Sequence, residues 1–165
     1  MDIKLRNFRQ DDFDAFHAIV SDYDVVKMTS SWPHPADPEF TRMRMNTPES
    51  QAGAVKVIEI DGQLAGVVGI VKNDVGYHIG KEFWGKGIMT RALDMRLAQE
   101  FADPEIDIIK SCVWIDNPAS ARVLEKVGFK RAYLCSDYCK ARDAEVEAIH
   151  FTLSRKDWEE SRGEL

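Results

Sequence analysis

Apolar positions give the first third of the chain a helical pattern broken by prolines. Phe13, Phe16 and Val20 recur at three- and four-residue spacing after the acidic start at 10–12, which predicts a helix. A short strand is expected before it, at residues 3–5. Prolines at 33, 35 and 38 exclude regular structure there, so we expect a loop and then a helix over 39–46.

From residue 55 the pattern changes to short β-rich runs. Runs at 55–60, 64–71 and 75–79, separated by turn residues at 61–62 and 73–74, predict three antiparallel strands. A helix over 87–101 and a strand over 108–115 follow. Asn117 and Pro118 then predict a helix start, and Gly128 predicts its end. Two strands, at 130–138 and 146–153, complete the expected order.

This order predicts a mixed α/β (α+β) fold with a largely antiparallel sheet and helices on both faces. The crossover from the fourth strand (75–79) through a helix to the fifth (108–115) predicts that these two strands are parallel. The sequence contains no repeat, low-complexity tract or long linker. We therefore expect a single domain over residues 1–165.

The segment between the fourth strand and the next helix has the character of an anion site. The helix begins at the second glycine of a close pair, Gly85 and Gly87, where backbone N–H groups and the positive end of the helix dipole favour a phosphate. Glycine lets the backbone approach a ligand closely, and Lys86 adds positive charge. By itself the pair fits a tight strand-to-helix turn equally well, and it is neither a Walker loop nor Gly-x-Gly-x-x-Gly.

Two motifs resemble those of a known family. The stretch 76–93, GYHIGKEFWGKGIMTRAL, resembles the coenzyme A motif of the GNAT superfamily of N-acetyltransferases, and 117–129, NPASARVLEKVGF, resembles its second motif. The resemblance covers essentially the whole chain and is closest to the ribosomal-protein N-terminal (alanine or serine) acetyltransferase branch. Trp84 and Met89 depart from the superfamily's general pattern, and Met89 would make the helix start bulkier.

The resemblance implies acetyl-CoA as co-substrate and a primary amine as acceptor, either a protein N-terminus or a small molecule, in a ternary complex. It implies a GNAT-like sheet that splays between the fourth and fifth strands and pairs there with the coenzyme. The residues expected to bind the coenzyme are Ile79, Trp84, Gly85, Lys86, Gly87, Ile88, Met89, Thr90, Asn117 and Ser120. An alternative is a degenerate acyl-CoA-binding regulatory module, because Leu124 replaces the tyrosine of many members.

The chemistry requires a donor for the departing thiolate and a route for the amine proton. The branch resemblance assigns the donor role to Ser120, which could instead only support the first helical turn. His78 and Glu59 are candidate bases. His78 has a suitable unperturbed pKa, but alternation along the strand could turn it away from the acceptor. A water relay to solvent is an equal alternative.

Composition limits the partners. The chain has 28 acidic and 22 basic side chains and a pI near 5.2, which argues against non-specific nucleic-acid or membrane binding. Its three cysteines form no disulfide or zinc pattern, so we expect no metal and a reducing compartment. The N-terminus lacks a signal-peptide core. A cytoplasmic protein is expected, and a homodimer is left open.

Overall fold

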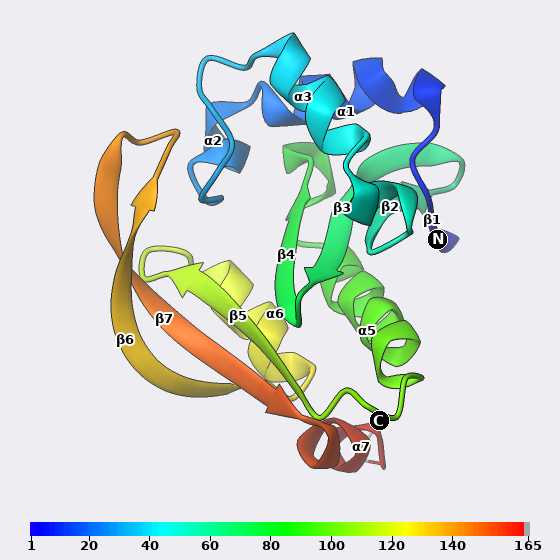
Figure 1. The fold of residues 1–165 in the computed structure, drawn as a ribbon, viewed down its shortest axis with the longest axis vertical. Helices are drawn as coiled ribbons and strands as arrows, with labels where there is room; N and C mark the ends of the chain where they lie inside the picture. Colours follow the sequence, from blue (N-terminus) through cyan, green and yellow to red (C-terminus); the bar gives the residue numbers. More distant parts are fainter. Residues whose placement is uncertain (164–165) are drawn as a thin grey trace.

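The computed structural model describes residues 1–163 and contains one seven-stranded sheet, in the order β1-β2-β3-β4-β5-β7-β6 (Figure 1). Neighbouring strands are antiparallel except β4 and β5, which are parallel. The predicted fold class is therefore confirmed. The elements are β1 Ile3–Arg6, η1 Gln10–Asp12, α1 Phe13–Val20, α2 Tyr23–Val26, α3 Pro38–Met45, α4 Pro48–Gln51, β2 Val55–Ile60, β3 Gln63–Val71, β4 Asp74–Ile79, η2 Lys81–Phe83, α5 Ile88–Phe101, β5 Ile108–Trp114, α6 Pro118–Lys126, β6 Lys130–Cys139, β7 Ala144–Ser154 and α7 Arg155–Gly163.

The sheet splays between β4 and β5. The two strands pair only where they begin, through Asp74 with Lys110 and Val75 with Ser111. Beyond these pairs they diverge toward their carboxyl ends, as Figure 1 shows. The predicted splay is confirmed. We call the space between the diverging ends of β4 and β5 the opening.

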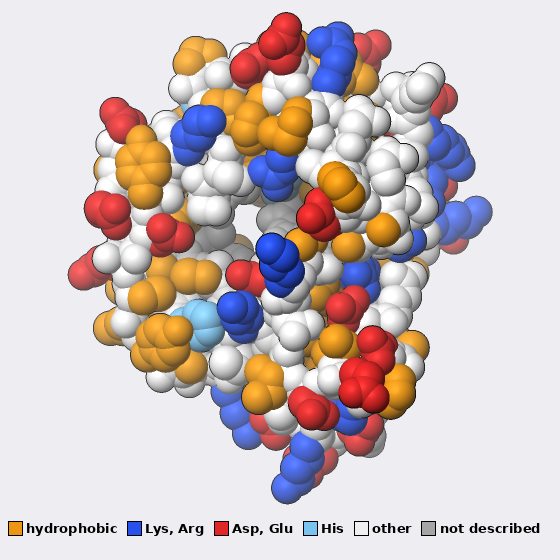
Figure 2. Space-filling view, viewed as in Figure 1, with side chains coloured by type: hydrophobic (Ala, Val, Ile, Leu, Met, Phe, Trp, Pro, Cys, Tyr) orange, Lys and Arg blue, Asp and Glu red, His pale blue; other side chains and the backbone are white. Residues whose placement is uncertain are grey.

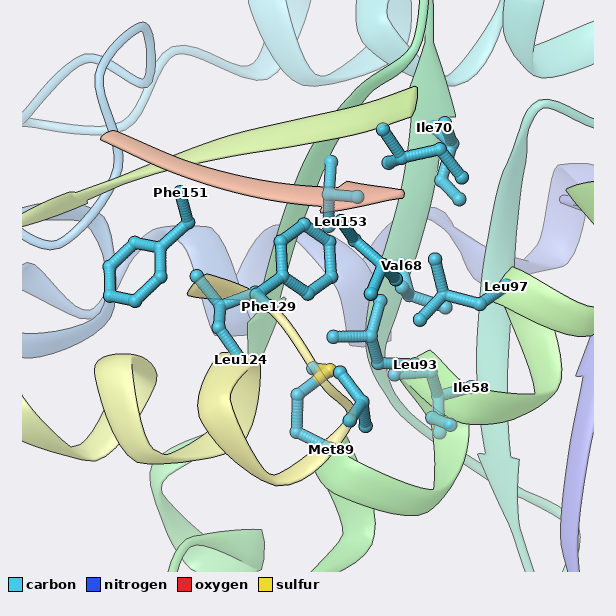
Figure 3. Packing of buried hydrophobic residues seen from close by; sticks show 14 of the residues in the cluster. Ile58, Val68, Ile70, Met89, Leu93, Leu97, Leu124, Phe129, Phe151 and Leu153 are labelled. Carbon is cyan, nitrogen blue, oxygen red and sulfur yellow. The ribbon is translucent and has the colours of Figure 1, made fainter. Parts of the chain in front are cut away.

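Helices cover both faces of the sheet, each over its own apolar cluster. On one face α5 and α6 pack through Leu93, Leu97 and Leu124 against β-strand side chains such as Phe151 (Figure 3). On the other face α1 to α3 pack over a second cluster that includes Phe16. Because strand residues alternate between faces, β4 contributes to both clusters.

Some local predictions need correction. The turn before β4 consists of Lys72 and Asn73 (φ 52° and 64°) rather than 73–74. The 61–62 turn is confirmed, with positive φ at both residues. The helices α2, α4 and α7 were not predicted; α2 and α4 have four residues each, too few to show a helical period. Within residues 1–163, none of the helices combines the length and apolar character needed to cross a membrane.

Candidate functional site

The turn before α5 has the geometry of an anion site. Gly85 and Gly87 have φ of 74° and 72°, a left-handed conformation that favours glycine, and Gly87 is the N-cap of the 14-residue helix. A Cβ added at either glycine would meet nothing within 4 Å, so the turn is open on its outer side. The first amide to donate back is that of Arg91, to the Gly87 carbonyl at 3.3 Å. The preceding amides of the first turn have no backbone acceptor in the part of the chain that the structure describes, so they can donate to a ligand.

The side chains of this turn point in different directions. Ile88 and Met89 are buried in the core, where Figure 3 shows Met89 packed among the apolar side chains. They can contact a ligand only through their amides. The expected crowding by Met89 is therefore absent, because its bulk lies inside the protein. Lys86 is exposed and Thr90 half-buried beside the turn.

The edge of β4 offers unpaired backbone groups to the opening. The Gly80 amide donates to the Ala65 carbonyl of β3 at 2.8 Å, so by antiparallel alternation the backbone groups of Tyr77 and Ile79 face β5. Pairing with β5 has already ended at Val75. The indole Nε1 of Trp84 donates to the Ile79 carbonyl at 2.9 Å. No strand among residues 1–163 pairs with the Tyr77 groups or the Ile79 amide.

Ser120 lies beside Tyr77, a residue that is not among those expected in the site. Asn117 caps α6 by accepting from the Ser120 amide at 3.3 Å. The Ser120 Oγ lies 2.6 Å from the Tyr77 hydroxyl, which can also donate to the Ser120 carbonyl at 3.2 Å. Burial raises the pKa of Tyr77 to about 12, against a smaller lowering by the bond to Ser120. Because adjacent side chains on a strand point to opposite faces, the sequence alone could have placed Tyr77 on the face opposite to His78, which in the structure is the α6 face.

His78 lies on the opposite face of β4, inside an aromatic cluster. Its ring stacks on Phe16 with centroids 5.7 Å apart and meets the Trp32 ring edge-on at 5.6 Å. Its Nδ1 is buried and has no hydrogen-bond partner among residues 1–163. Burial, with a smaller contribution from the charge of Arg44, lowers the pKa of His78 to about 4. A ring with this pKa is a poor acceptor for the proton of an ammonium group.

Glu59 is engaged in a different network. Its Oε1 accepts from Arg6 Nε at 3.0 Å, and the other guanidinium nitrogens of Arg6 donate to Asp12, both at 2.8 Å. Its strand, β2, is separated from β4 by β3. The structure therefore does not bring Glu59 to the opening. No group of three or more potential metal ligands occurs in the described part of the chain.

The opening thus gathers most of the predicted coenzyme residues and Ser120, whereas Glu59 lies away from it and His78 is buried on the face of β4 opposite to Tyr77. The α5 turn supplies amides, β4 supplies unpaired backbone, and α6 supplies a hydroxyl held by Tyr77. Such a site fits a long ligand that carries phosphate at one end and pairs with a strand along its length.

Comparisons with known proteins find acetyltransferases. Bacillus subtilis YdaF, named as a candidate ribosomal N-acetyltransferase, is 28% identical over 106 residues, which cover 60% of this chain and 58% of that protein. The chain spans about half the length of the curated relatives it matches.

Two solved structures share the fold. The spermidine N-acetyltransferase of Vibrio cholerae, in complex with CoA and spermine, superposes with a TM-score of 0.79 at 15% identity, covering 94% of this chain and 97% of that one. RimJ of Mycobacterium smegmatis, in complex with CoA-disulfide, gives a TM-score of 0.75 at 24% identity, covering 93% and 82%.

A family model described as an acetyltransferase (GNAT) domain matches residues 2–130, a stretch that includes both motifs and the whole splayed region. The chain belongs to the GNAT acetyltransferase domain family.

Proposed function

We propose that this protein transfers the acetyl group of acetyl-CoA to a primary amine, with a protein N-terminus as the favoured acceptor. The observation that carries the proposal is the unpaired edge of β4, which runs from the open α5 turn to the hydroxyl pair of Tyr77 and Ser120. Such an edge can pair with the amide-bearing arm of coenzyme A while the turn binds its phosphates. The relatives named as N-acetyltransferases support the same activity.

The reaction proceeds by direct attack in a ternary complex. The amine nitrogen attacks the thioester carbon, the carbon–sulfur bond breaks, coenzyme A leaves as thiolate, and the ammonium proton passes to water. A thiol has a pKa of about 8.5, whereas that of Tyr77 is raised to about 12. Net proton transfer from Tyr77 to the thiolate is therefore unfavourable. The hydroxyl pair acts instead as a hydrogen-bond donor: Tyr77 donates to Ser120 Oγ, and Ser120 donates to the departing sulfur.

Because neither candidate base serves the opening, an acceptor with a low pKa is favoured. Of the two candidate bases, His78 is too weak and Glu59 is ion-paired away from the opening. An α-amine, with a pKa near 7.7–8.0, is roughly a quarter to two-fifths neutral at about pH 7.5, whereas a lysine amine is about one-thousandth neutral. An N-terminal amine can thus react with water as the proton acceptor, which supports it over an alkylamine.

The test is acetylation of a peptide with serine at its N-terminus and one internal lysine, with the modified amine located by fragmentation in a mass spectrometer. We expect one acetyl group on the α-amine, none on the lysine, and no reaction when the N-terminus is blocked. Faster acetylation of spermidine or of the lysine would contradict the N-terminal assignment. Coenzyme binding with no transfer to any amine would indicate the regulatory-module alternative.

A further inference from the structure

A short loop crosses the opening on the face covered by α1 to α3. We call residues 29–32 the mouth loop. At one end the Trp114 indole Nε1, from the end of β5, donates to the Thr29 carbonyl at 3.3 Å. At the other end Trp32 packs edge-on against His78 of β4, with ring centroids 5.6 Å apart. The mouth loop therefore joins the two diverging strands on the side opposite to α5 and α6. Because the proposed coenzyme site occupies the α5 and α6 side, this side is left for the acceptor.

Two cations at this loop have no acidic partner. Arg44 Nη1 donates to Ser31 Oγ at 2.8 Å, and its guanidinium carbon lies 4.9 Å from the Trp32 ring. The Lys140 amide donates to the loop at the Ser30 carbonyl, and its Nζ lies 4.8 Å from the ring of Phe40. Within residues 1–163, no carboxylate forms an ion pair with either cation. Figure 2 shows Lys and Arg side chains near the upper rim of the opening.

Two other cations near the mouth loop are ion-paired, whereas Arg44 combines the lack of an ion pair in the described part of the chain with partial burial. Lys27 pairs with Asp24 at 3.2 Å, and Arg142 pairs with Asp116 at 2.7 Å. In a chain with 28 acidic and 22 basic side chains, carboxylates are in excess. Arg44 is also partly removed from water, which lowers its pKa. A partly buried charge without a counter-ion is costly, so a ligand that supplies one is stabilised.

We infer that the acceptor carries a carboxylate close to its amine and that Arg44 binds this carboxylate at the mouth loop. The planar guanidinium suits a two-point contact with a carboxylate, and Lys140 strengthens the local positive field. The phosphates of coenzyme A do not provide this counter-ion, because the α5 turn lies on the other face of the sheet. The inference rests on the proposed function and narrows its acceptor to amines bearing a carboxylate.

The test compares acceptors that differ only in charge. One pair of peptides begins Ser-Asp or Ser-Asn with the rest identical, and a second pair is a free amino acid and its amide. We expect the protein to favour the carboxylate member of at least one pair by tenfold or more in kcat/KM. A preference in the peptide pair would identify a side-chain carboxylate as the ligand of Arg44, and a preference in the amino-acid pair would identify an α-carboxylate. Arg44→Gln should abolish the preference by lowering kcat/KM for the carboxylate member far more than for its uncharged partner, and should leave the KM for acetyl-CoA unchanged. Arg44→Lys should retain part of the preference.

Arg42→Gln is the matched control, because Arg42 lies on the same helix and stacks instead on Phe13. It should keep the full preference. The inference is overturned if the unaltered protein shows no preference or favours spermine. It is also overturned if Arg44→Gln lowers both members of the favoured pair equally, because the arginine then has only a structural role. Acetylation of no amine at all would instead remove the proposed function, and this inference with it.

Discussion

The contact between Tyr77 and Ser120 can be tested by removing the tyrosine hydroxyl alone. Tyr77→Phe removes one hydroxyl that lies 2.6 Å from Ser120 Oγ and leaves the ring in its place on β4. A hydrogen bond of this kind contributes about 1 kcal/mol net to folding. In a chain of this size, such a loss lowers the Tm by about 2–4 °C. The variant should therefore fold.

The effect on catalysis should be larger than the effect on stability. Without Tyr77, the Ser120 hydroxyl loses the partner that directs its proton toward the departing sulfur. We expect kcat to fall about tenfold, which corresponds to about 1.4 kcal/mol, and the KM for acetyl-CoA to stay within about twofold. Ser120→Ala removes the donor itself and should cost about a hundredfold, near the low end for one transition-state donor.

The assay is steady-state release of coenzyme A thiol from both single variants and the double variant, with Tm measured on each. If Tyr77 acts through Ser120, the double variant should match Ser120→Ala within about twofold. Tyr133→Phe, which removes the hydroxyl of an exposed tyrosine, is the control and should be unchanged. The idea that Tyr77 acts through Ser120 would be refuted if the rate loss of the double variant equals the product of the two single losses. A Tyr77→Phe rate within twofold of the unaltered protein would refute it as well.

Two further predictions concern coenzyme binding and pH. Gly87→Val should weaken coenzyme A binding at least tenfold in calorimetry, because it strains a φ of 72° and places a side chain over the amides. The control is Gly62→Val, which has a φ of 86° and no neighbour within 4 Å and should lose stability but bind coenzyme A normally. If both variants bind coenzyme A equally well, the turn does not bind the phosphates. His78 has a folded-state pKa of about 4, below its unfolded value near 6.5, so its stabilising contribution is complete above pH 6.5 and is lost as pH falls toward 4. In denaturant unfolding, the unaltered protein should therefore lose up to about 3 kcal/mol of unfolding free energy as the pH falls from 6.5 to 4, and His78→Phe should not show this loss. If the unfolding free energies of the unaltered protein and His78→Phe change in parallel with pH, the low pKa is contradicted.

The sequence predicted the fold well because its signals are local. The turn residues Asp61 and Gly62 and the cap at Asn117 act through their own backbone conformation, so their positions follow from the chain alone. The prediction failed where the period was too short to read, as in α2 and α4, and where adjacent residues compete for one turn, as at Lys72 and Asn73.

The site was predictable only in part, because its side chains acquire their roles from partners far away in the sequence. Nothing in the residues around Glu59 indicates that Arg6, which lies 53 residues earlier, would bind it. The partner of Ser120 is likewise 43 residues distant, and the low pKa of His78 follows from burial under α1 and the mouth loop. The backbone amides of the α5 turn needed no such partner.

The most direct test of the central claim is the initial rate of coenzyme A thiol release from acetyl-CoA, measured with and without a peptide that begins with serine. We predict release that depends on the peptide, is stoichiometric with acetylation of its α-amine, and falls about a hundredfold in Ser120→Ala. Tight binding of acetyl-CoA with no peptide-dependent release, or an unchanged rate in Ser120→Ala, would contradict it.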